Sequence, residues 1–179
     1  MLFLGTEKHP DADFDAFLNE NSGNSNAYTD YTQTNYYFEC ADSAFREALD
    51  RFGNFFINPL FNKDLVDREM NAVNSEHSKN LQDDGCRKEQ LFAFSSLPES
   101  PLNKFGTGSL ETLKFDSIRD DLIKFYKENY SSNLMKVCIY THEKIADIED
   151  YVVNLFEQIP NTEIPPPTYP QKPFPNEVF

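Results

Sequence analysis

Two carboxylates, Glu69 and Glu76, have a spacing that could support chemistry. They are seven residues apart, and a helix of 3.6 residues per turn brings both side chains to nearly the same face. Ala72 and Val73 share that face, so the spacing predicts that both carboxylates can point toward the interior. A buried carboxylate must be paired, hydrogen-bonded or bound to a metal, because an unmatched buried charge is costly. The alternative is an exposed, charged helix face, where Glu is common.

Both residues lie in a stretch, Lys63 to Leu97, that predicts one long helix bent or broken near Gly85. No proline interrupts it before Pro98. Apolar residues recur there at helical spacing: Leu65, Ala72, Val73, Leu81 and Leu91.

The segment Arg68–His77, together with the opening Met1–Thr6, resembles the M16 metallopeptidases, and within them the first, N-terminal domain of the insulysin branch. In that family an inverted motif, H-x-x-E-H, supplies two zinc-binding histidines and a glutamate general base, and a glutamate on a later helix completes the site. The resemblance implies that Glu76 is this later metal ligand. It implies that Glu69 supports the site from outside the coordination shell.

The 179 residues contain no H-x-x-E-H, and the resemblance places that motif immediately before Met1. We therefore expect Zn²⁺ to bind in a complete protein and this chain alone to be inactive, with no catalytic residue of its own. The favoured function is part of a zinc-dependent metalloendopeptidase. The alternative is a non-catalytic M16 homologue that acts as a peptide-binding or scaffold subunit.

Strand-like runs at residues 26–29 and 34–40 predict a β-hairpin. Their sequence is similar to the segment with which M16 enzymes bind substrate, where an exposed edge strand pairs with an extended peptide. The resemblance implies that Asn26 and Ala27 make the backbone contacts and that Tyr28 forms a wall of the pocket near the cleaved bond. An ordinary hairpin is the alternative.

Four further helices are expected, at residues 10–21, 44–57, 118–130 and 144–158, where apolar side chains recur on one face. A strand is expected at residues 134–140. This order predicts the α+β fold class, with helices covering a sheet. The M16 resemblance implies a LuxS/M16-like metallohydrolase domain with an antiparallel-rich sheet that is incomplete at its N-terminus.

Residues 1–160 are interpreted as a partial M16 N-terminal peptidase domain, and residues 161–179 as a proline-rich linker to a following domain. The prolines at positions 165–167, 170, 173 and 175 favour an extended, polyproline-like backbone. An SH3-type ligand is the alternative interpretation of this segment.

The formal net charge of −14 argues against nucleic-acid and anionic-membrane partners, since both would repel the chain. Expected partners are peptide substrates and the remaining M16 domains, and a homo-oligomer is a further candidate. Three widely spaced cysteines, Cys40, Cys86 and Cys138, indicate reduced thiols and a cytoplasmic location. Cys40 and Cys138 are expected to pack in the core.

Overall fold

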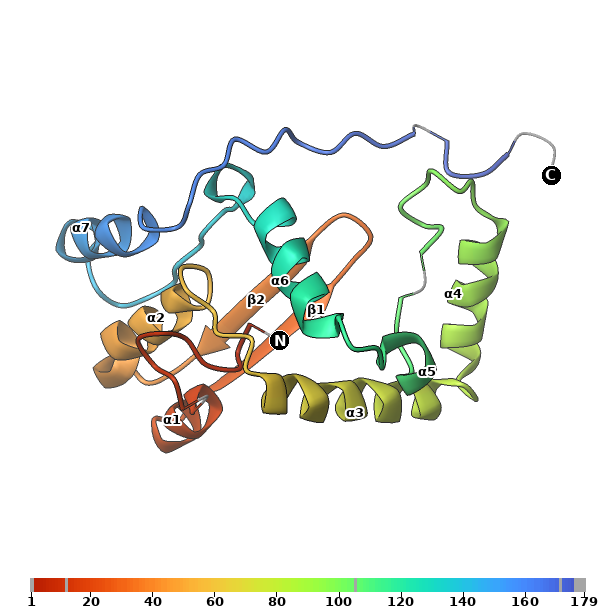
Figure 1. The fold of residues 1–179 in the computed structure, drawn as a ribbon. Coiled ribbons are helices and arrows are strands. Elements are labelled where there is room, and N and C mark those ends of the chain that lie inside the picture. Colours follow the sequence, from red (N-terminus) through yellow and green to blue (C-terminus); the bar gives the residue numbers. More distant parts are fainter. Residues whose placement is uncertain (1, 12, 105, 171, 176–179) are drawn as a thin grey trace. The chain divides into compact units, whose positions relative to one another are not determined.

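The computed structural model describes residues 2–11, 13–104, 106–170 and 172–175. The elements follow one another along the chain in a mixed order of helices and one hairpin (Figure 1): α1 (Phe14–Glu20), β1 (Asn24–Thr29), β2 (Thr34–Glu39), the 3₁₀ helix η1 (Asp42–Ala44), α2 (Phe45–Asn54), α3 (Lys63–Asn80), α4 (Asp84–Ser95), α5 (Leu110–Leu113), α6 (Ile118–Asn129), the 3₁₀ helix η2 (Ser132–Leu134) and α7 (Ile145–Phe156). The predicted hairpin and α+β class are confirmed.

The described residues belong to two compact units. The first comprises Met1–Ala27, Tyr36–Val66 and Arg119–Pro165, and the second comprises Tyr28–Asn35, Asp67–Ile118 and Pro166–Phe179. Within the part of the chain that the structure describes, no helix is long and apolar enough to cross a membrane.

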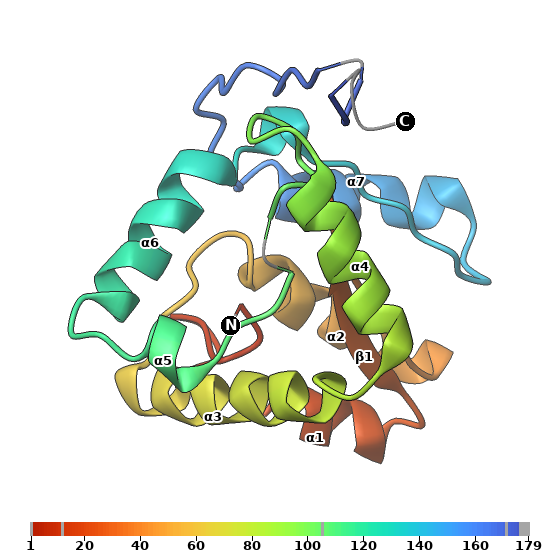
Figure 2. The same ribbon diagram turned by 90° about the vertical axis from the view of Figure 1, so that its right-hand side faces the viewer.

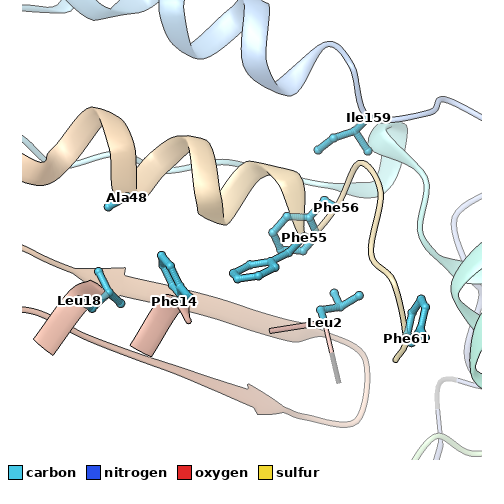
Figure 3. Close-up of a cluster of buried hydrophobic side chains, with 8 residues drawn as sticks. All are labelled: Leu2, Phe14, Leu18, Ala48, Phe55, Phe56, Phe61 and Ile159. Atoms are coloured by element: carbon cyan, nitrogen blue, oxygen red, sulfur yellow. The ribbon is translucent and has the colours of Figure 1, made fainter. Parts of the chain in front are cut away.

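The core of the first unit is largely aromatic, and its principal cluster collects residues from α1, α2 and the segments around them (Figure 3): Leu2, Phe14, Leu18, Ala48, Phe55, Phe56, Phe61 and Ile159. A second cluster joins α2 to α7 through Phe45, Leu49, Ile148 and Leu155. Gly53 allows this approach, since a Cβ there would lie 2.9 Å from Leu155 Cδ2. Burial of this apolar surface is the main favourable term in folding of the unit.

The opening segment is attached to α2 through Asp50. Lys8 Nζ donates to Asp50 Oδ1 at 2.6 Å, and His9 Nε2 lies 2.9 Å from Oδ2. Burial of the Asp50 carboxyl opposes its ionisation, but the hydrogen bonds from Lys8 and His9 outweigh burial and hold its pKa below the usual value. Thr6, which is fully buried, also forms an antiparallel bridge with Pro59.

The break predicted near Gly85 is confirmed: the long helical stretch is two helices, α3 and α4, separated by residues 81–83. The reason is the N-cap of α4: Asp83 has an extended backbone, and its Oδ1 accepts the Cys86 N–H at 2.8 Å. A side chain that satisfies a free amide at a helix start fixes the boundary there. Gly85 then lies within the first turn of α4.

The predicted strand at residues 134–140 is wrong. Leu134 ends η2, and residues 135–140 pair with no strand among the described residues, whose sheet consists of β1 and β2. Alternating apolar residues form a strand only where another strand offers its backbone groups. Cys138 is consequently exposed, which corrects its expected core position, whereas Cys40 is half-buried and packs against both clusters.

Gly23, which lies just before β1, gives the first testable prediction. A Cβ at this position would collide with the Glu39 carbonyl oxygen and lie 2.9 Å from Cys40 Cα, and both are backbone atoms that cannot move cheaply. We expect Gly23→Ala to lower the free energy of unfolding by about 1–3 kcal/mol, measured by urea denaturation.

Gly106→Ala is the matched control, because a Cβ there meets no atom within 4 Å. It should leave stability unchanged or raise it by up to about 1 kcal/mol. Equal stability of the two variants would contradict the packing described at Gly23.

Candidate functional site

Helix α3 carries both predicted metal-site carboxylates, but it exposes one of them. Val66 and Met70 are buried, at 1% and 5% exposure, whereas Glu69 is half-buried and Glu76 is exposed. Ala72 is exposed as well. The expectation that both carboxylates can point to the interior is therefore wrong for Glu76, because the buried side of α3 runs through Val66 and Met70 instead.

The C-terminal half of α3 is connected to α5, which lies beside it in both views (Figures 1 and 2). The Leu110 N–H donates to Asn74 Oδ1 at 3.0 Å, two residues before Glu76. Helix α5 begins with a capping box, in which the Ser109 N–H donates to Thr112 Oγ1 at 2.9 Å. The start of α5 is thus fixed on α3, at a residue close in sequence to Glu76. Sequence reasoning missed this contact, although the Ser-x-x-Thr spacing signals the cap.

The described residues do not by themselves fit a zinc ion. They contain no group of three or more His, Cys, Asp or Glu side chains that could hold a metal, whereas protein zinc sites use three or four such ligands. His9 lies against Asp50, and His142 Nδ1 lies 2.8 Å from Asp42 Oδ2. His77 follows Glu76 directly and points about 100° away from it around the helix. From this set Glu76 can contribute one accessible carboxylate.

The predicted substrate residues lie on β1, and all three are exposed: Asn26, Ala27 and Tyr28, the last at 50%. The Asp30 N–H donates to the Gln33 carbonyl at the hairpin turn. In an antiparallel pair the bonded and non-bonded positions alternate, so this register directs the Ala27 N–H away from β2.

The Ala27 N–H donates at 2.8 Å to Asn26 Oδ1, the side chain of its own neighbour. Among the described residues β1 pairs only with β2. The outer edge of β1 is therefore accessible, and its Ala27 amide is held by a local side chain that another acceptor can replace.

Comparison with known proteins shows the family of this chain. The family model for Insulinase (Peptidase family M16) matches residues 1–98, and the model for the Peptidase M16 inactive domain matches residues 117–179. Both models therefore place the chain in one family of peptidases. This chain belongs to peptidase family M16, in its insulysin branch.

Several known proteins are similar to this chain over nearly its whole length. Insulin-degrading enzyme from Homo sapiens is 44% identical over 99% of this chain and 18% of its own length. A-factor-processing enzyme from Saccharomyces cerevisiae is 44% identical over 94% of this chain and 17% of its own length. The solved structure of pitrilysin has a TM-score of 0.91 and 32% identity, over 98% of this chain and 19% of that chain. The chain thus spans less than a fifth of the length of these proteins.

The contact between α3 and α5 gives the second prediction. Asn74→Ala removes the acceptor of the Leu110 N–H, so we expect faster amide hydrogen exchange at Leu110 and a loss of about 1 kcal/mol of stability. NMR-detected exchange measures the first quantity and denaturant unfolding the second.

Asn71→Ala is the matched control one turn earlier, because the exposed Asn71 side chain donates only to the Asp67 carbonyl of the same helix. The rate of amide hydrogen exchange at Leu110 should be the same in Asn71→Ala as in the wild type. Unchanged exchange in Asn74→Ala would contradict the role assigned to Asn74.

Proposed function

We propose that this chain is part of a zinc-dependent metalloendopeptidase that degrades peptides bound as an added β-strand. The observation that carries the proposal is the accessible outer edge of β1, where the Ala27 amide has only a local side-chain acceptor. Membership of family M16 supports the peptidase chemistry. A relative from Schizosaccharomyces pombe, 44% identical, also has the words zinc protease in its name.

An edge strand suits a peptidase because it recognises the main chain of its substrate. Backbone groups of an extended peptide pair with those of β1, so most sequences are accepted, and alternate side chains fill pockets. In this proposal Ala27 provides the backbone contact at the outer edge, and the Asn26 side chain, which now holds the Ala27 amide, gives way to the peptide. The exposed ring of Tyr28 forms a pocket wall. The net charge of −14 favours neutral or cationic peptides.

For the metal, we propose that Glu76 is one anionic ligand and that Glu69 orients the site without touching the ion. Exposure of the Glu76 carboxylate supports this role, because a ligand must be reachable by residues of other segments. The two histidines and the general base would come from an H-x-x-E-H segment outside these 179 residues. Bound zinc would supply a water molecule acidic enough to ionise near neutral pH.

It follows that the 179 residues alone should be inactive, since the described residues offer no complete metal site. In the same proposal residues 1–160 form part of the peptidase domain, and residues 161–179 link it to another M16 domain. The alternative function is a peptide-binding or scaffold subunit that uses the β1 edge without a metal. The experiments on Glu76 and Glu69 distinguish the two.

The third prediction concerns zinc. In a longer M16 polypeptide that includes both these residues and an H-x-x-E-H segment, Glu76→Gln should abolish stoichiometric zinc binding and peptide cleavage, because an amide is a poor zinc ligand. Glu69→Gln should reduce zinc affinity or activity by only about 10–100-fold. Metal content by atomic absorption and cleavage of a fluorogenic peptide measure both effects.

The matched comparison is Glu89→Gln, an exposed glutamate on α4, which should behave as wild type. Wild-type activity in Glu76→Gln would overturn the ligand assignment. A folded protein with no zinc and no cleavage, even before mutation, would favour the non-catalytic subunit.

The fourth prediction concerns the β1 edge. In the same longer polypeptide, Ala27→Pro removes the outward N–H while leaving the bonds to β2, because proline is tolerated on a free edge. We expect kcat/KM to fall by about tenfold, the effect of one or two lost backbone hydrogen bonds. Steady-state kinetics on an unstructured peptide provide the measurement.

Ala27→Ser is the control, since it keeps the N–H and a small side chain, and it should retain near wild-type kcat/KM. If both substitutions had the same effect, the Ala27 amide would not be a substrate contact.

A further inference from the structure

The proline-rich segment after α7 has a feature that the peptidase proposal does not use. Residues 165–169 read Pro-Pro-Pro-Thr-Tyr, and all five are exposed. They form no helix or strand, and the chain runs through them as an extended trace (Figure 1). The Tyr169 side chain is among the exposed aromatic residues, at 44%.

Three consecutive prolines fix φ near −65° and favour the polyproline II helix, which has three residues per turn and a rise of 3.1 Å per residue. In that conformation Pro166 and Tyr169 are one turn apart, so they lie on the same edge of the helix about 9 Å from each other. Pro167 lies between them on the adjacent edge. The segment therefore offers two proline rings and a phenol with a fixed spacing.

The chain is anchored on either side of this stretch. Upstream, Asn133 Nδ2 donates to the Ile164 carbonyl at 2.8 Å, within the first unit. Downstream, the Leu97 N–H donates to the Pro173 carbonyl at 2.8 Å, within the second unit. Between these anchors, residues 165–170 make no hydrogen bond to other described residues.

An extended segment with free backbone carbonyls and exposed rings loses little conformational entropy when a partner binds it. The Tyr169 hydroxyl and the proline carbonyls remain available as hydrogen-bonding groups. These are the properties of a linear docking motif rather than of a packed linker.

We propose that Pro166-Pro167-Thr168-Tyr169 is a docking site for a WW-type domain. Such a domain holds polyproline II segments between aromatic rings, and the sequence Pro-Pro-x-Tyr adds a tyrosine that fills a neighbouring pocket. This interaction is independent of zinc and of the β1 edge. It would bring an M16 protein to a partner that carries such a domain.

An SH3 domain is the competing binding partner for this segment, and it would contact Pro167, Pro170 and the cation of Lys172. SH3 grooves place acidic side chains against that cation, and a chain with net charge −14 opposes their approach. Lys172 also already takes part in an interaction within this chain. The Pro-Pro-x-Tyr motif needs no cation, so the WW-type domain is favoured.

The test is titration of the purified 179-residue chain with a WW domain of the class that binds Pro-Pro-x-Tyr, and separately with an SH3 domain of the class that binds Pro-x-x-Pro-x-Lys. Isothermal calorimetry should give a Kd on the order of 10–100 μM for the WW domain, because a four-residue motif buries little area. Pro166→Ala and Tyr169→Ala should each weaken binding by at least about tenfold.

Two control substitutions make the result specific. Tyr140→Ala removes another exposed tyrosine, 97% accessible and far away in sequence, and should leave binding unchanged. Pro170→Ala lies outside the four-residue motif but inside the SH3 motif, so it should not affect the WW domain. Thermal melting should be the same for all variants, since the substituted side chains are exposed or hydrogen-bond nothing in the described chain.

The proposal is overturned if the WW domain shows no saturable binding up to about 1 mM, or if Tyr169→Ala binds as tightly as wild type. Binding of the SH3 domain alone, lost in Pro170→Ala and kept in Pro166→Ala, would also overturn it. None of these three outcomes affects the proposed peptidase function, which is tested by zinc content and cleavage in the longer polypeptide.

Discussion

Aromatic packing holds β2 of the hairpin against the core of the first unit. Along β2, Tyr36 and Phe38 are half-buried and alternate with exposed residues. The ring centroids of Phe38 and Phe14 are 5.7 Å apart, and those of Tyr36 and Phe56 are 5.3 Å apart. Both pairs have an edge-to-face geometry. Such aromatic pairs stabilise a fold by more than the burial of their apolar area alone. β2 therefore holds the hairpin on the core, while the residues predicted to contact substrate lie exposed on β1.

Hydrogen bonds add to the packing at the same place. The Tyr36 and Tyr130 hydroxyls are 2.6 Å apart, and burial, with that hydrogen bond, raises the pKa of Tyr36. Burial also raises the pKa of Tyr126 to about 12, and its hydroxyl donates to the Phe56 carbonyl at 2.7 Å. Both phenols stay neutral at physiological pH, so their hydrogen bonds do not change there. The hydrogen bonds of these two hydroxyls, which add to the packing beside the hairpin, therefore persist across the physiological pH range.

The sequence predicts those elements whose signal is local. The hairpin, α2, α6 and α7 follow from alternation or from an apolar stripe, and the boundaries agree to within a few residues. The strand at residues 134–140 could not be predicted in the same way, because pairing depends on a second strand that no local pattern reveals. The break near Gly85 was predictable, but its cause, the cap at Asp83, was not identified from the sequence.

The metal-site carboxylates show a further limit of helical spacing. Seven residues bring Glu69 and Glu76 to neighbouring positions, but spacing does not say which side of the helix is buried. The Met70 side chain is only 5% exposed, so its side of α3 is the buried one. Glu69, which is next to Met70, is half-buried, whereas Glu76 is exposed. The half-buried residue suits a supporting role, and the exposed one suits a ligand shared with other segments. Glu76 is held in place by α3 itself, which is fixed to α5 through Asn74 two residues away. In the zinc site proposed above, a single exposed carboxylate on a fixed helix is the contribution of this chain, and the other ligands come from other segments.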